Sequence, residues 1–167
     1  MPEPSSLPYQ DTKPVGAADF YFGINATFRF IRQRLGDEGL VRYWRSMGEQ
    51  YFRPVTELWK KDGLPAVARY WRDFFAAEPG SDVQVHIDDN QITVEVRTCP
   101  AIAHLRAAGR EIESRFCQHC YFVSEAMAVP AGLTVRVEGG NGTCRQKFFA
   151  PNSTTEPQDL RCIVSCA

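Results

Sequence analysis

The first position whose residue type suggests chemistry is Cys99, which stands directly before Pro100. Proline at the first position of a helix gives up no needed N–H group, so Cys99 is the expected N-cap residue. A thiol there faces unpaired backbone N–H groups and the positive end of the helix dipole, which favour the thiolate. His104 follows five residues later and reaches Cys99 only if the helix starts irregularly. The alternative is a small buried thiol at a strand–helix junction.

The densest group of reactive side chains is Cys117-Gln118-His119-Cys120. Two cysteines at this spacing can bind one metal ion while the backbone amides of the turn stabilise the charge on sulfur. A zinc ion or an iron–sulfur cluster needs two further ligands. Cys144 could supply one, and Cys162 and Cys166 could supply two if the C-terminal tail folds back. A redox dithiol and simple apolar burial are the alternatives.

A glycine-rich segment, Gly139-Gly140-Asn141-Gly142, predicts a tight turn between two strands. Glu138 and Arg145 flank this turn, which makes them candidates for contact with a substrate. Glu138 could act as a general base on water if it pointed into a pocket, although a carboxylate at a strand end is more often solvated. Cys144 is expected on the same strand face as the apolar Phe148.

A short echo links residues 39–45 and 63–72, in which Arg-Tyr-Trp-Arg occurs as Arg42–Arg45 and again as Arg69–Arg72. Trp44 and Trp71 could line a pocket for an anionic small molecule, because arginine forks bind carboxylates in a bidentate manner. Aromatic residues at helical spacing are more often core, with the arginines on the solvated flank. The core interpretation is the one that we favour.

Helical periodicity dominates the first half of the chain. Apolar residues at three-to-four spacing predict a helix from Ala17 to Leu35, with a stripe formed by Phe20, Ile24, Phe28, Ile31 and Leu35. A second helix starts near Asp37, and Pro54 should break or kink it. A third helix covers about residues 64–77 and ends at Pro79-Gly80.

The period changes to two in the second half, where residues 83–87 and 92–96 predict a β-hairpin. Pro100 opens a helix of about fifteen residues with Ile102, Leu105 and Ile112 inward, and a further helix covers residues 118–129. Strands at 133–137 and 143–149 complete a ββ-αα-ββ order. Grouped strands and helices indicate an α+β fold whose antiparallel sheet packs against helices.

The predicted organisation is an extended Pro-rich arm over residues 1–16, one domain over 17–149 and a tail over 150–167. With 167 residues, 44% of them hydrophobic, and a net charge of −1, the chain can bury a core and offers no basic surface for nucleic acid. No apolar run is long enough for a membrane span, and the first residues do not form a secretory signal. We therefore expect a cytoplasmic location, where cysteines serve metal binding, catalysis or burial.

Several of these motifs together resemble the L-2-amino-thiazoline-4-carboxylic acid hydrolase-like family. They are Cys99-Pro100, Phe116–Cys120, Gly132 and the segment Gly139–Arg145. The second half is also similar to the 4-vinyl-reductase domain, a small-ligand sensor module. The resemblance covers residues 17–149 and implies attack on a cyclic C–N bond. A thiolate at Cys99 or Cys117 would then be the nucleophile, and His104 or His119 would shuttle the proton.

Three functions follow as hypotheses. The chain could be a small hydrolase of a cyclic amidine or thiazoline, or a sensor domain that binds a small-molecule ligand without catalysis. It could also be an accessory subunit whose cysteines hold zinc or an iron–sulfur cluster. In that case the arm and the tail would engage a larger partner or a second copy of the chain.

Overall fold

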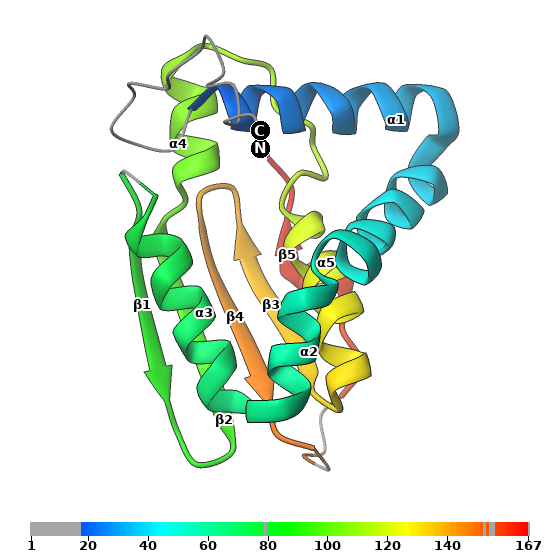
Figure 1. The fold of residues 1–167 in the computed structure, drawn as a ribbon. Helices are drawn as coiled ribbons and strands as arrows, with labels where there is room; N and C mark the ends of the chain where they lie inside the picture. The colour runs from blue at the N-terminus through cyan, green and yellow to red at the C-terminus, as the bar shows by residue number, and fades with distance from the viewer. Residues whose placement is uncertain (1–17, 79, 152, 154–155, 167) are drawn as a thin grey trace, which may run out of the picture.

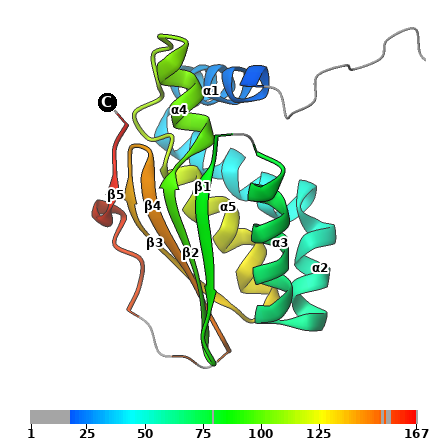
Figure 2. The same cartoon turned by 90° about the vertical axis from the view of Figure 1, so that its left-hand side faces the viewer.

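A computed structural model describes residues 18–78, 80–151, 153 and 156–166 of the chain. Three helices cover one face of a five-stranded sheet, namely α2 (Arg53–Asp62), α3 (Leu64–Ala76) and α5 (Gln118–Ala128). Two more, α1 (Ala18–Ser46) and α4 (Pro100–Ala107), lie across one end of the sheet (Figures 1 and 2). The prediction of an α+β fold with a sheet packed on helices is confirmed. The predicted arm at residues 1–16 lies outside the described residues.

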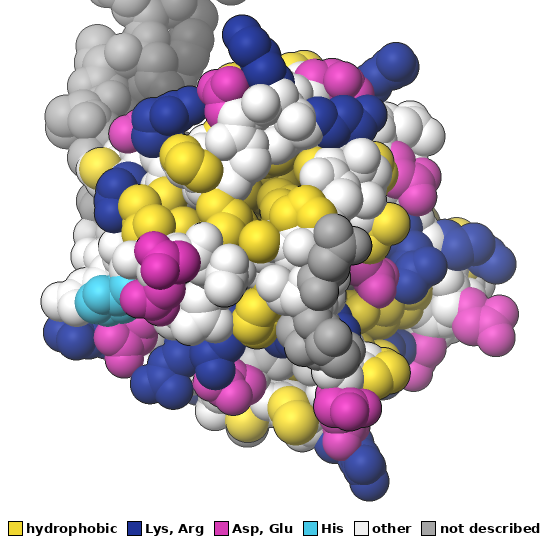
Figure 3. Space-filling model, turned by 90° about the horizontal axis from the view of Figure 1, so that it is seen from below, with side chains coloured by type: hydrophobic (Ala, Val, Ile, Leu, Met, Phe, Trp, Pro, Cys, Tyr) yellow, Lys and Arg dark blue, Asp and Glu magenta, His cyan; other side chains and the backbone are white. Residues whose placement is uncertain are grey.

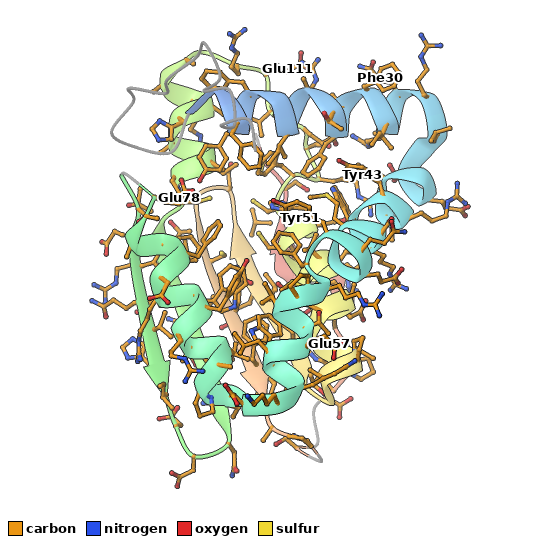
Figure 4. All side chains as sticks on the ribbon, viewed as in Figure 1. Phe30, Tyr43, Tyr51, Glu57, Glu78 and Glu111 are labelled. Carbon is orange, nitrogen blue, oxygen red and sulfur yellow. The ribbon has the colours of Figure 1, made fainter. Side chains whose placement is uncertain are left out.

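Helix α1 contains the junction where the sequence predicted two separate helices. Gly36 has a φ of 69° and a ψ of −173°, which are not helical, so α1 consists of two helical segments that meet at a kink where the sequence predicted the division. The middle of the predicted apolar stripe faces inward, because Phe28 is buried and Ile24 and Ile31 pack against the core. Its two ends are wrong, because Phe20 and Leu35 are exposed. The stripe of α1 that faces inward also includes the polar Asn25. Phe30 lies on the outer side of α1 (Figure 4).

The break predicted at Pro54 is confirmed. A π-helical turn, Met47–Tyr51, follows α1, and α2 then begins with Pro54 in its first turn, where proline lacks no needed N–H group. Within the π-helical turn Gly48 packs so closely on α5 that an added Cβ would lie 2.6 Å from the carbonyl oxygen of Val123. A glycine is therefore what allows these two segments to approach each other.

The sheet has the strand order β1-β2-β4-β3-β5. Its strands are β1 (Asp82–Ile87), β2 (Gln91–Thr98), β3 (Thr134–Gly140), β4 (Thr143–Phe149) and the two-residue β5 (Ile163–Val164). Both predicted hairpins are present, and the first four strands pair in antiparallel fashion. The sequence did not predict β5, which comes from the tail and pairs with β3 in parallel, so the complete sheet is mixed.

The helix predicted from Pro100 is much shorter than expected. Helix α4 ends at Ala107, and Gly109 has a φ of 60°, which turns the chain away from the helix. The following segment is held by Asn25 of α1, whose side chain donates to the carbonyl oxygen of Glu111 and accepts from the amide of Glu113. These bonds satisfy backbone groups that a longer helix would have paired internally.

The far end of the sheet, at the β1–β2 turn, presents a mixed surface. Apolar side chains gather in the middle of this end, and charged side chains surround them (Figure 3). Within the described ranges, no helix is both long enough and apolar enough to span a bilayer.

Candidate functional site

Four cysteine side chains that are far apart in the sequence line one small cavity next to α4 and the β3–β4 turn. They are Cys99, Cys117, Cys120 and Cys144. The cavity has a volume of about 20 Å³, close to the least that holds one water molecule. Phe116, Val137 and His119 complete its walls together with glycines of the turn. The tertiary structure thus brings thiols from three separate segments of the chain to the wall of one cavity.

Three structural elements hold the four thiols. Cys99 is the N-cap residue of α4, as predicted, and its amide donates to the carbonyl oxygen of Gly142 over 2.9 Å. Cys144 lies on β4 between Val96 of β2 and Gly139 of β3. The other two cysteines flank the start of α5. Since α4, α5 and the sheet pack on one another, the positions of the four sulfurs are set by the core.

The turn between β3 and β4 closes the cavity with backbone instead of side chains. An added Cβ at Gly139 would lie 2.7 Å from the carbonyl oxygen of Thr143, so no side chain fits there. The amide of Asn141 donates to the sulfur of Cys117 over 3.2 Å. Arg106 of α4 donates to the Asn141 carbonyl oxygen over 3.0 Å and fixes the turn against the helix. The glycine run that predicted a turn therefore also supplies a wall and a donor to sulfur.

All four thiols have a raised pKa, three of them chiefly because of burial and Cys117 chiefly because of its hydrogen bond with Cys166. Burial raises the pKa of Cys144 to about 12, and the charges of Cys99 and Cys117 contribute to that rise. The pKa values of Cys99 and Cys120 are also raised, chiefly by burial and then by the neighbouring thiols. For Cys99 the amides of Ala101 and Ile102 at the start of α4 oppose this effect without cancelling it. Without a cation, these thiols are neutral at pH 7.

His119 is held in one orientation beside the cavity. Its Nδ1 lies 2.5 Å from the carbonyl oxygen of Phe116, and its ring packs against those of Phe28 and Phe116. Because a carbonyl oxygen only accepts, Nδ1 carries the proton and Nε2 is the free acceptor, 3.8 Å from the sulfur of Cys120. Burial lowers the pKa of His119, so the imidazole is neutral at pH 7.

A fifth sulfur touches the edge of this group. Cys166 in the tail lies with its Sγ 3.3 Å from the Sγ of Cys117. The shared hydrogen bond raises the pKa of Cys117 and lowers that of Cys166. The tail does fold back, as the metal hypothesis required. Cys162, by contrast, is exposed on the short helical turn Leu160–Cys162 and does not line the cavity.

The other predicted site residues lie outside this cavity, although Glu138 and Arg145 line a separate open groove of about 200 Å³ together with Cys144. His104 is not a wall of the cavity; it stacks on Tyr21, whose hydroxyl donates to Glu78 over 2.5 Å. Glu78 lies just beyond α3, on the side of α1 (Figure 4). Glu138 is exposed and forms ion pairs with Arg145 and Lys147, each at 3.4 Å. Glu138 and Arg145 lie on the face of the sheet that is turned away from the helices. The carboxylate of Glu138 is therefore solvated.

The two tryptophans of the sequence echo do not share a pocket. Trp44 is completely buried between Phe28 and Phe122, with ring centroids 5.4 and 5.8 Å away. Trp71 packs against Phe75 and Phe148 at the other end of the helical layer. The favoured assignment of these residues to the core agrees with this packing, and a shared substrate pocket has no geometric support.

In the part of the chain that the structure describes, no three His, Cys, Asp or Glu side chains are grouped so that they could hold a metal ion. The sulfurs surround a space and do not converge on one point. Set against protein-family models, curated proteins and solved structures, the chain matches none of them. The resemblance to the hydrolase-like family therefore stays a prediction, and the geometry of the site has to carry the functional argument.

Sequence reasoning missed one member of the group. We assigned Cys99 to nucleophilic chemistry and took the metal ligands from the other five cysteines, whereas Cys99 lies in the same cavity wall as Cys117 and Cys144. The signal that could have found it is positional. Cys99 directly follows β2, and β2 pairs with the strand that carries Cys144.

Proposed function

We propose that this protein is an iron–sulfur protein whose cluster is bound by Cys99, Cys117, Cys120 and Cys144. The single observation that carries the proposal is that these four thiols line one cavity that is walled by apolar side chains and glycines. Four cysteine thiolates are the usual ligand set of [2Fe–2S] and [4Fe–4S] clusters.

The size of the cavity favours an inorganic group over an organic ligand. Binding sites for small organic molecules usually measure about 300 Å³ or more, whereas this cavity is about 20 Å³. Metal–sulfur bonds of roughly 2.3 Å are much shorter than non-bonded contacts of about 3.5–4 Å. A group bonded directly to the sulfurs therefore needs less free space than a substrate in van der Waals contact. A cluster core of four or eight atoms is nevertheless larger than one water molecule, so the proposal requires the four thiols to move apart when the cluster binds.

Among the described His, Cys, Asp and Glu side chains no three are placed to hold a metal ion, so the thiols must shift before they bind any metal. Tetrahedral zinc requires four ligands that converge on one point at about 2.3 Å. A cluster is bound from outside, with thiolates attached to different iron atoms, so its ligands stand further apart. The amide of Asn141, which donates to the sulfur of Cys117, is the kind of contact that tunes the potential of a cluster.

Reconstitution of the full chain with ferrous iron and sulfide under anaerobic conditions tests the proposal. We expect iron and sulfide in equal amounts, about two or four per chain, and a visible absorption band that bleaches on reduction. Cys99→Ser, Cys117→Ser, Cys120→Ser and Cys144→Ser should each lose most of the iron. Cys162→Ser is the matched control, because this cysteine is exposed and outside the cavity.

Two results would contradict the proposal that the four cysteines bind a cluster. One is a wild-type protein that takes up one zinc per chain and no iron. The other is full iron content in all four cavity variants, which would place any cluster elsewhere. Failure to fold is separated from failure to bind by circular dichroism of each variant without metal.

A second candidate function is the cysteine hydrolase that the sequence suggested. One observation favours it, namely the position of Cys99 at the start of α4, where the amides of Ala101 and Ile102 favour a thiolate. A nucleophile should react with iodoacetamide near neutral pH much faster than the other five cysteines. Equally slow alkylation of all six, mapped by mass spectrometry, would remove this candidate.

A further inference from the structure

The cavity has four thiols, but a fifth is held against it by a specific arrangement of the tail. The side chain of Cys166 is 6% exposed, and its amide donates to the carbonyl oxygen of Ser114 over 2.9 Å. Upstream, β5 pairs with the end of β3 at Gly139 and Gly140. Figure 2 shows the tail running along the sheet face that the helices leave open. The contact between Cys166 and Cys117 is therefore built by several backbone bonds.

Two further details show that the chain is shaped to receive the tail. Gln158 bonds to both the amide and the carbonyl oxygen of Val137, at 2.8 and 3.0 Å, and so extends the pairing beyond β5. Gly140 has a φ of 151°, and a Cβ there would lie 2.3 Å from the carbonyl oxygen of Val164. Any side chain at position 140 would push β5 away.

We propose that Cys117 and Cys166 form a reversible disulfide when no cluster is bound, so that the tail controls access to a cluster ligand. The two sulfurs are 3.3 Å apart, and no other pair of sulfurs among the described residues makes such a contact. A disulfide needs about 2.05 Å between sulfurs, so a small movement of the tail is sufficient. The control of loading rests on the proposed function, whereas formation of the disulfide does not.

The oxidant is a low-molecular-weight disulfide such as oxidised glutathione. One of the two cysteine thiolates attacks it, forms a mixed disulfide and releases one glutathione thiolate. The second cysteine thiolate then attacks the cysteine sulfur of the mixed disulfide and releases the other glutathione thiolate. Two cysteine thiols are oxidised to one disulfide, one external disulfide is reduced to two thiols, and the two protons of the cysteines end on the two released glutathione thiolates. A dithiol reductant reverses the reaction.

The consequence follows from the double role of Cys117. A sulfur bonded to Cys166 cannot bind iron, so the oxidised chain offers only three thiols to a cluster. Conversely, a bound cluster occupies Cys117 and protects it from oxidation. Loading and disulfide formation therefore exclude each other, and the thiol redox state decides which one occurs.

The first measurement uses the full chain without metal, so that it does not depend on the cluster. After incubation with oxidised glutathione, alkylation and non-reducing digestion, we expect a peptide pair that joins Cys117 to Cys166. Cys166→Ser should abolish this pair, and Cys162→Ser should leave it unchanged. Gln158→Ala, which loosens the tail without touching a sulfur, should slow its formation about tenfold.

The second measurement follows iron uptake after the same oxidation. The oxidised wild-type protein should bind little iron until a dithiol reductant is added, whereas Cys166→Ser should load equally well with and without the oxidant. No cross-link, or one through Cys162 or Cys120, would overturn the disulfide. A cross-link in a protein that never binds iron would instead refute the proposed function, and with it the control of loading, while the disulfide itself would stand. Equal inhibition by oxidation in wild type and Cys166→Ser would refute the control of loading.

Discussion

Strand β4 passes through two environments that differ sharply although they share one strand face. At one end Phe148 is completely buried and packs against Trp59 of α2, with ring centroids 5.6 Å apart. Four residues earlier, Cys144 is half-buried in the wall of the cysteine cavity. Gln146 lies between them and is also buried. The aromatic end is filled by large side chains, whereas at the cysteine end glycines and small thiols surround a space.

This difference separates side chains that stabilise the fold by close packing from buried thiols that contribute little to its stability. A filled aromatic core gains free energy from apolar burial and close contacts. The cavity gains little in this way, because its thiols are desolvated and repel one another when they ionise. Such a group of side chains is stabilised only when a cation joins it.

The aromatic end offers the largest expected effect. Trp59→Ala removes a side chain that is completely buried and contacts Tyr70 and Phe148. We expect a loss of about 3–5 kcal/mol in the free energy of unfolding, measured by urea denaturation. Iron uptake by the folded fraction should be unchanged. A loss below about 1 kcal/mol would mean that this end is not the main source of stability.

The cysteine end of β4 should instead make the free energy of unfolding depend on pH. Because folding raises the pKa of Cys144 from 9.0 to about 12, its contribution to stability is fully present below pH 9 and is lost as pH rises toward 12. The reduced, metal-free protein should therefore become less stable in urea between about pH 8 and about pH 10.5. Cys144→Ala should reduce this slope, and Cys162→Ser should not. An identical slope in Cys144→Ala would contradict the buried setting of this thiol.

The smallest effect is expected at the residue between the two ends. The Oε1 atom of Gln146 is buried without a hydrogen-bond partner among the described residues, and Val94 and Val137 are its neighbours across the strands. Gln146→Met keeps a similar shape and removes the unpaired oxygen, so stability should stay equal or rise by about 1 kcal/mol in urea denaturation. A loss of more than 1 kcal/mol would show that the amide makes a needed contact.

The elements that sequence reasoning identified best have strong local signals. The two hairpins follow from alternation and from turn residues, and the N-cap position of Cys99 follows from Pro100. The predictions fail where contacts with a segment distant in the sequence determine the length of a helix or its buried side. Helix α4 is cut short because Gly109 turns the chain and Asn25 binds the residues that follow. Likewise, the buried stripe of α1 is set by what it packs against and not by apolar periodicity alone.

The candidate site shows the same division. The sequence by itself determined which thiols exist, that Cys117 and Cys120 are one helical turn apart, and that glycines would close the β3–β4 turn. Only the tertiary structure decided that Cys99 joins them, that Cys162 does not, and that Cys166 rests on Cys117. The physical reason is the distance along the sequence over which each kind of interaction acts. Backbone preferences act over a few residues, whereas the meeting of four thiols depends on how strands pair and helices pack across the whole chain.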